Sequence, residues 1–272
     1  MRDELKISAI DTLCPGNSLR EKIYLLEQLG IEGIELESAL SWPLSEKIKT
    51  ANDILSTSKV KLSAVLVGYQ GKLLSRNNRT RKKTIDRIKK YMEACAELDG
   101  VGVVTVPSPH KSRNPFQFFM YPRKENKKSL AVEQYRKLGK YAQELGIYIM
   151  IEPLDRSRVN FINTCNEAVD ICRKTENDAV RICPDFFHMS IEEPEISKRI
   201  NELSEYIPHL HIGDNDSKSE FAILPGKGKL DFVAIFGALR KIKYSSYLSL
   251  DCKIPTKEEL ASSVQYLRKL VQ

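Results

Sequence analysis

The sequence lacks the features that would place it in a membrane or in an export pathway. No stretch approaches the roughly 18 continuous apolar residues that a membrane-spanning helix needs. The first residues, Met1 to Leu5, do not have the basic-then-apolar layout of a signal peptide. We therefore expect a soluble cytoplasmic protein with no membrane partner.

The sequence also lacks paired cysteines. Its six cysteines are scattered along the chain and none belongs to a C-x-x-C pair: Cys14, Cys95, Cys165, Cys172, Cys183 and Cys252. In a long cytoplasmic chain, cysteines of this kind are mostly free, small core residues. A structural zinc site of the thiolate type is therefore not expected.

What the sequence does contain is one pattern that repeats from end to end. A short apolar run rich in β-branched residues is followed by a longer amphipathic stretch, with no linker between repeats. Between residues 7 and 247 the mean step is about 34 residues, and a βα unit needs about 30. The eight runs begin near Ile7, Ile31, Leu62, Val101, Ile147, Val180, His209 and Tyr247. This pattern predicts an α/β fold, a (β/α)8 TIM barrel, formed by residues 1–272 as one domain.

Helix-start signals support this interpretation. Three capping boxes precede the amphipathic stretches, at Ser18 with Glu21, Thr164 with Glu167, and Thr256 with Glu259. The spacing is irregular only after the fourth run, where residues 109–128 form a long polar and aromatic segment. In a barrel this segment lies on the catalytic face, and we expect a loop that acts as a lid.

Four of the last five runs end in a carboxylate or an imidazole. These residues are Glu152, Asp185, His211 and Asp251. The carboxyl ends of barrel strands meet at the catalytic mouth, so the four side chains should converge there. Any one of them alone is better explained as a salt-bridged strand end, but buried carboxylates need a partner and a shared cation supplies one. The sequence predicts one divalent metal ion, Mn2+, Mg2+ or Co2+, with Zn2+ as an alternative.

The motifs around these residues resemble those of the xylose isomerase-like TIM barrel family. The resemblance is to its sugar phosphate isomerase/epimerase group, which includes tagatose and psicose 3-epimerases. It rests on the segments Glu152-Pro153-Leu154-Asp155-Arg156, Asp185-x-x-His188, His211-x-x-Asp214-Asn215-Asp216, Pro225-Gly226-Lys227-Gly228 and Gly33-Ile34-Glu35-Leu36. It implies that Glu152, Asp185 and His211 are metal ligands and that Glu152 is also a catalytic base. It further implies that His188 contacts a substrate oxygen. We predict that Arg156 and Lys227, which lie in these motifs, bind substrate.

Two residues depart from the family pattern. The eighth strand of this family usually ends in Glu, where this chain has Asp251, and an Arg common in epimerases is replaced by Ser217. We predict that Asp251 is a ligand and a catalytic residue, but its side chain is one methylene shorter. A misplacement of about 1 Å can cost on the order of 100-fold in rate. We therefore expect same-face proton transfer, giving isomerisation or elimination more readily than C3 epimerisation.

The formal net charge of +7 raises the question of an anionic partner. Basic residues between Arg76 and Lys90, together with Lys111, Arg113, Arg123 and Lys124, would favour an anionic substrate if they border the mouth. A solvated helix face is the default explanation for such a run.

Four functions remain open at this point. The leading one is a metal-dependent isomerase or epimerase of a sugar, a sugar phosphate or a small hydroxy-keto compound. A lyase of the keto-inositol or dehydroshikimate dehydratase type would use the same base. An abasic-site endonuclease needs a cluster of several histidines, and the chain has four in all, so nucleic acid is an unlikely partner. A non-catalytic barrel is the fourth, and the sequence leaves open whether the chain forms a homo-oligomer.

Overall fold

Eight parallel strands form the centre of the protein. The computed structural model describes residues 5–38, 44–108, 124–193 and 195–271. Hydrogen-bonded neighbours run in the order β6-β5-β4-β3-β2-β1-β8-β7. The strands are β1 (Lys6–Ile10), β2 (Gly33–Glu37), β3 (Lys61–Tyr69), β4 (Gly102–Val106), β5 (Tyr148–Ile151), β6 (Val180–Ile182), β7 (Leu210–Ile212) and β8 (Tyr247–Leu250). The predicted TIM-barrel fold is confirmed.

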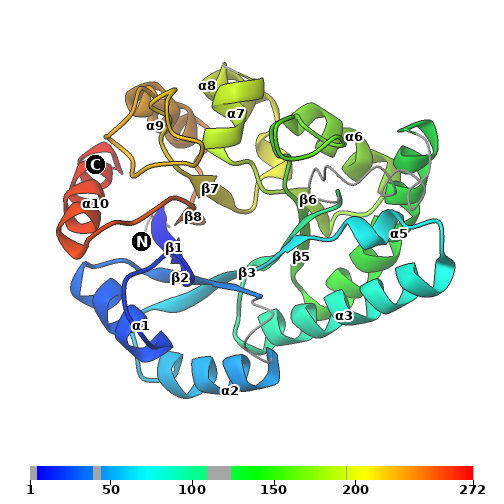
Figure 1. Ribbon diagram of the computed structural model, residues 1–272, viewed down its shortest axis with the longest axis horizontal. Coiled ribbons are helices and arrows are strands. Elements are labelled where there is room, and N and C mark those ends of the chain that lie inside the picture. Colours follow the sequence, from blue (N-terminus) through cyan, green and yellow to red (C-terminus); the bar gives the residue numbers. More distant parts are fainter. Residues whose placement is uncertain (1–4, 39–43, 109–123, 194, 272) are drawn as a thin grey trace.

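Helices surround these strands (Figure 1). Within the described residues they are α1 (Leu19–Gln28), α2 (Leu44–Leu55), η1 (Gly71–Leu74), α3 (Asn78–Glu97), α5 (Lys124–Leu145), α6 (Cys165–Thr175), α7 (Phe186–Glu192), α8 (Ile196–Glu202), η2 (Ser204–Tyr206), α9 (Phe232–Lys241) and α10 (Lys257–Val271). Among the described residues, no helix combines the length and the apolar character needed to cross a membrane.

The barrel closes between β6 and β7 through a single bridge. The other strand neighbours pair over three to five residues, whereas Asp185 and His211 form an isolated parallel bridge. The amide of His211 donates to the Pro184 carbonyl at 2.9 Å. Two of the four residues expected at the mouth therefore also join the last open edge.

Side chains alternate between two environments along each strand. In β7, Leu210 and Ile212 belong to the large apolar core that the helices cover, while His211 points into the barrel. In β8, Leu248 and Leu250 join the same outer core. Since the interior is packed rather than open, polar residues with interior positions must find partners within it.

At all three predicted capping boxes the hydroxyl accepts from a backbone amide at the helix start, and the box at Thr164 is complete. The Thr164 hydroxyl accepts from the Glu167 amide and the Glu167 carboxylate accepts from the Thr164 amide, which fixes the start of α6. The expected lid loop needs correction at its end, because α5 already begins at Lys124 and residues 124–128 are helical. Its remainder, residues 109–123, lies outside the described residues.

Candidate metal centre and active-site cavity

The structure brings the four predicted strand-end residues together. Each of Glu152, Asp185, His211 and Asp251 offers one ligand atom, and these atoms all lie within 4.8 Å of one another. His211 Nδ1 is 2.8 Å from Glu152 Oε1 and 3.5 Å from Asp251 Oδ2. The convergence follows from the topology, because Glu152, Asp185 and Asp251 follow the carboxyl ends of β5, β6 and β8. His211 lies within the neighbouring strand β7 rather than at its end.

This cluster has more negative charge than it can balance. The group contains three carboxylates and one imidazole, that of His211. Glu152, Asp185 and His211 are buried. Burial, and then the carboxylates of Asp185 and Glu152, raise the pKa of Asp251 to about 7, although His211 partly opposes them. A divalent cation would relieve this repulsion, and oxygen-rich sites of this kind suit Mn2+ or Mg2+. The donor set therefore fits the predicted metal.

Asp185 has a second role that explains its position. It is the N-cap of α7, and its Oδ1 accepts from the amides of Phe187 at 2.6 Å and His188 at 3.2 Å. Capping orients the carboxylate by satisfying backbone donors at the helix start. The same turn directs His188 toward the cavity, which explains the Asp185-x-x-His188 spacing.

His188 is held by a carboxylate. Its Nδ1 lies 2.7 Å from Asp155 Oδ2, and Asp155 Oδ1 accepts from the Ser157 amide at 2.8 Å. Burial alone would lower the pKa of His188, but the carboxylates of Asp185 and Asp155 raise it. With Nδ1 bonded to Asp155, Nε2 is the nitrogen that remains for a ligand in the cavity.

A cavity of about 630 Å³ opens over the cluster. Glu152, Asp185, His188 and Asp251 line it together with apolar side chains such as Leu66 and Phe187. This combination of a few convergent polar groups and an apolar wall is typical of small-molecule sites.

Two predicted substrate-binding residues lie away from the described lining. The Arg156 side chain is 71% exposed and contacts Glu192 at 3.1 Å, and Lys227 is exposed. Arg158, two residues further along the same loop, does line the cavity. Binding by Arg156 and Lys227 stays a prediction, and Arg158 is a cavity residue that the sequence analysis missed.

Arg158 joins two loops across the mouth. It donates to the Glu220 carbonyl at 2.6 Å, and its guanidinium lies 4.4 Å from the centre of the Phe221 ring. Phe221 also lines the cavity and is 59% exposed. The loop after β5 and the loop after β7 therefore meet above the cluster of Glu152, Asp185, His211 and Asp251.

The Pro225-Gly-Lys-Gly motif shapes the second of these loops. Asp214 accepts from the amides of Gly226 and Gly228 at 3.0 and 2.7 Å, and from Leu230 at 3.1 Å. A Cβ at Gly228 would lie 2.3 Å from Asp214 Oδ1, and Gly226 has a φ of +86°. Gly228 is required because its backbone lies against the buried Asp214 carboxylate. Gly226 is required because its φ is left-handed and a Cβ there would lie 2.9 Å from the Tyr266 ring.

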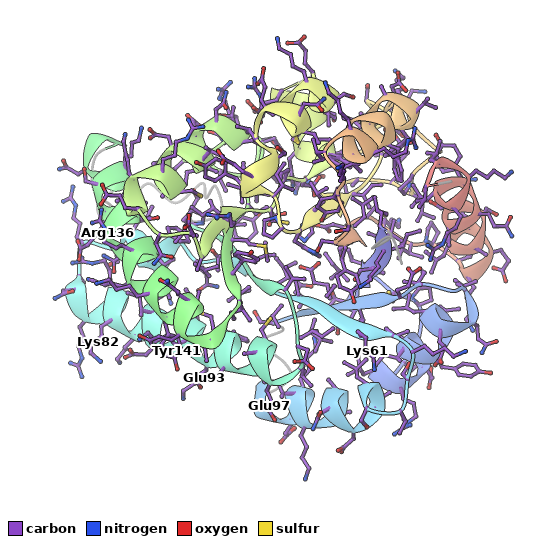
Figure 2. The ribbon with its side chains drawn as sticks, turned by 180° about the vertical axis from the view of Figure 1, so that it is seen from behind. Lys61, Lys82, Glu93, Glu97, Arg136 and Tyr141 are labelled. Atoms are coloured by element: carbon purple, nitrogen blue, oxygen red, sulfur yellow. The ribbon has the colours of Figure 1, made fainter. Side chains whose placement is uncertain are left out.

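The basic run on α3 does not border the cavity. None of the basic residues between Arg76 and Lys90 is among the described lining residues, whose cations are Arg158 and Lys253. Lys82 lies on the outer side of the helix layer (Figure 2), where it pairs with Asp86 at 3.0 Å. Lys111, Arg113 and Arg123 lie outside the described residues, as does the side chain of Lys124. A solvated helix face therefore explains the described part of the run.

Comparison with known proteins assigns the fold to a family. A model described as "Xylose isomerase-like TIM barrel" matches residues 23–270. The chain belongs to this family. It is 28% identical to 3-dehydro-D-guloside 4-epimerase of Escherichia coli (strain K12) over 88% of each chain. It is 30% identical to D-psicose 3-epimerase of Enterocloster bolteae over 58% of this chain and 50% of that protein.

Solved structures agree over the whole length. The apo structure of 3-keto-D-glucoside 4-epimerase, YcjR, from E. coli has a TM-score of 0.81 at 25% identity, covering 98% of both chains. D-Psicose 3-epimerase with D-tagatose from Clostridium cellulolyticum H10 has a TM-score of 0.84 at 21% identity, covering 98% of this chain and 99% of that one. The fold of the sugar epimerases therefore extends across this chain.

Proposed function

We propose that this protein is a metal-dependent sugar epimerase that acts on a carbon next to a keto group. The observation that carries the proposal is the convergence of Glu152 and Asp251 with Asp185 and His211 on one cavity. Relatives named as 3-epimerases and as a 4-epimerase support the type of reaction. The names of these relatives give different sugars, so the substrate of this protein has to be identified by experiment.

Glu152, Asp185, His211 and Asp251 would hold the metal, with Mn2+, Mg2+ or Co2+ preferred for its oxygen-rich donors. Zn2+ stays an alternative, and one structure with this fold, an IOLI protein, is described with a bound zinc atom. When bound, the ion supplies Lewis acidity that makes a proton beside a carbonyl easier to remove.

Different side chains around the cavity would carry out the separate proton transfers. Glu152 would accept the proton, and Asp251 would return one from the opposite face of the substrate. His188 bonds Asp155 through Nδ1, and the nearby carboxylates raise its pKa, which favours the doubly protonated ring. In that form Nε2 would donate to the oxygen on which negative charge develops. Each of these residues lines the cavity except Asp155, which acts by orienting His188.

Isomerisation is the competing outcome, and Asp251 is the observation that favours it. If the shorter carboxylate does not reach the opposite face, Glu152 would return the proton to the neighbouring carbon on the same face. Elimination would begin with the same step. The stereochemistry of the product separates these reactions.

The described cavity lining does not select an anionic sugar by its charge. It contains the acids Glu37, Glu152, Asp185 and Asp251 and the cations Arg158 and Lys253, and a divalent ion would balance the remaining negative charge without an excess of positive charge. An abasic-site endonuclease is disfavoured, because the only histidines in the metal-capable groups of the described residues are His209 and His211.

The test is a screen of free and phosphorylated keto sugars and keto-glycosides in D2O, monitored by NMR with Mn2+-loaded and metal-free protein. We expect the loaded wild type to yield an inverted centre that carries one solvent deuterium. Asp251→Asn should retain exchange and lose inversion, while Glu152→Gln should lose both, with metal content measured for each.

An isomerised product with deuterium on the adjacent carbon would support same-face transfer instead. Absence of exchange on every sugar, in wild type with a full complement of metal, would refute the proposed activity. Faster turnover of the phosphorylated sugars than of the free ones would show that the site takes an anionic substrate.

A further inference from the structure

Beneath the proposed metal centre lies a buried polar group that the mechanism above does not use. Glu35 on β2 is fully buried, as are His209 and His211. Glu35 Oε2 lies 2.9 Å from His209 Nε2, and Glu35 Oε1 lies 3.0 Å from His211 Nε2. One carboxylate thus faces the same ring nitrogen of two imidazoles, whose rings are nearly perpendicular at 86°.

The chemistry of these partners fixes where the protons are. An ionised carboxylate accepts hydrogen bonds and cannot donate them. Both imidazoles must therefore carry a proton on Nε2. His209 Nδ1 has no hydrogen-bond partner among the described residues, which suits a lone pair better than a buried N–H because an unpaired donor is costly.

The consequence for His211 concerns its other nitrogen. With the Nε2 proton held by Glu35, Nδ1 is the nitrogen left to face Glu152 at 2.8 Å and Asp251 at 3.5 Å. A metal-binding histidine needs a lone pair on the nitrogen toward the metal, and a carboxylate on the opposite nitrogen fixes that tautomer. Glu35 occupies the position such a partner requires.

We infer that Glu35 is a positioning residue for the metal centre, and that it holds His211 in the tautomer whose Nδ1 faces the ligand cluster while His209 holds Glu35 in place. This inference rests on the proposed metal site. It assigns a role to a residue 176 positions away from His211 in the sequence. Glu35 does not contact the cavity among the described residues.

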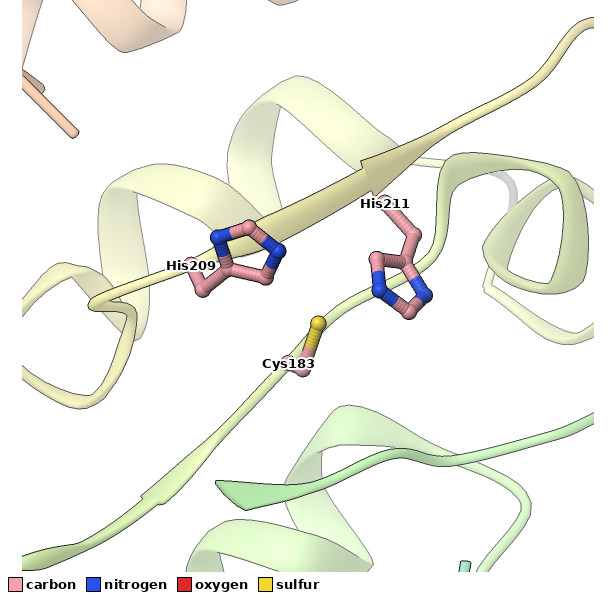
Figure 3. A group of neighbouring side chains, drawn as sticks. All are labelled: Cys183, His209 and His211. Carbon is pink, nitrogen blue, oxygen red and sulfur yellow. The ribbon is translucent and has the colours of Figure 1, made fainter. Parts of the chain in front are cut away.

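A second metal site is the rival explanation for the same group. Cys183, His209 and His211 could each offer one ligand atom, all within 4.8 Å of one another, and Figure 3 shows the three side chains gathered between neighbouring strands. However, both Nε2 atoms already face Glu35. A metal there would have to share His211 with the oxygen-rich centre above it. The hydrogen bonds of Glu35 with His209 and His211, which we call the Glu35 brace, use the same nitrogen atoms without displacing any of them.

The test measures Mn2+ binding without substrate, by calorimetric titration of the full-length chain. Glu35→Gln keeps the shape but offers one acceptor oxygen and an NH2 group, so it favours the wrong tautomer of one imidazole. We expect Mn2+ affinity to fall by about 10- to 100-fold, the range for losing such a partner. His209→Gln should weaken binding less, because Glu35 still faces His211.

Ser63→Ala is the matched control. Ser63 bonds Ser8 at 2.7 Å, and both are fully buried strand residues. The variant therefore removes a buried hydrogen bond that does not involve His211, and its Mn2+ affinity should equal that of the wild type. Equal affinity in Glu35→Gln and wild type would overturn the inference. Failure of the wild type to bind Mn2+ would instead refute the proposed metal site.

A second measurement does not depend on any variant folding. The chain has four histidines, so 15N-histidine labelling gives a simple spectrum of ring nitrogens. With Mg2+ bound, His211 should carry its proton on Nε2, and a proton on Nδ1 would contradict the inference. Titration with Co2+ tests the rival metal site at Cys183, His209 and His211. Binding of one equivalent without a cysteine-to-cobalt absorption band supports the Glu35 brace, whereas binding of a second equivalent with that band overturns it.

Discussion

At the scale of single residues, Asp251 would link the proposed metal binding to pH. Burial and two neighbouring carboxylates raise its pKa to about 7 in the metal-free protein. The unfolded chain loses this proton near the ordinary carboxyl pKa of about 4. As pH rises from there through about 7, the metal-free fold is therefore progressively destabilised relative to the unfolded chain. The raised pKa of His211 acts in the same direction, because its stabilising contribution is lost as pH rises through the folded value.

We predict that Mn2+ raises the melting temperature more at pH 8 than at pH 6, because at the lower pH the ion must first displace the proton. Thermal unfolding with Mn2+ and with a chelator, from pH 5.5 to 8.5, measures this difference. In the chelated state, Asp251→Asn should flatten the decline with pH. Parallel curves for the variant and the wild type would show that Asp251 is not the group responsible.

At the scale of elements, the loops after β5 and β7 meet through Arg158 and Phe221, and this contact borders the cavity. We predict that Arg158→Ala and Phe221→Ala each raise KM several-fold with a smaller effect on kcat, because they shape the mouth and touch no reacting group. A cation–π contact of this exposure contributes about 0.5–1 kcal/mol. Steady-state kinetics on the sugar identified by the screen would measure the effect.

Arg173 offers the control for this prediction. Its guanidinium lies 5.4 Å from the Tyr206 ring, between outer helical segments and away from the described cavity lining. Arg173→Ala removes a contact of the same kind, and both kinetic constants should stay at the wild-type values. A loss of kcat with unchanged KM in the Arg158 variant would place that residue in the chemical step instead.

The same elements mark how far the sequence could predict the structure. Strand-end residues such as Glu152 and Asp251 were predictable because the alternation along a strand and the parallel topology determine where they point. The choice between Arg156 and Arg158 was not, because both lie on a non-repetitive loop whose turns set side-chain direction. Glu35 resembled a family motif, but its pairing with His209 and His211 joins strands that local periodicity cannot relate.

At the scale of the whole molecule, the barrel closes through the residues that would bind the metal. Asp185 and His211 form the bridge between β6 and β7, whereas β2 and β3 pair over five positions. A ligand that binds only the folded state stabilises it by mass action. A metal ion held by Asp185 and His211 would do so across the junction of β6 and β7, where the strands share only this bridge among the described residues.

We predict that Mn2+ slows amide hydrogen exchange in β6 and β7 more than in β2 and β3. Exchange followed by mass spectrometry, with and without the ion, would measure this, and the Asp185→Asn variant should lose the difference. Uniform protection of all eight strands would indicate that the ion stabilises the fold only globally.

The single bridge between β6 and β7 has a consequence for the life of the protein in a cell. Cellular proteases cleave chains that have partly unfolded, so the rate at which a protein is degraded depends on the population of its unfolded form. If one ion holds the edge that opens most easily, manganese supply would set how long each molecule survives as well as whether it works. A cell starved of the metal would then remove the idle enzyme, and restoring activity would require new synthesis.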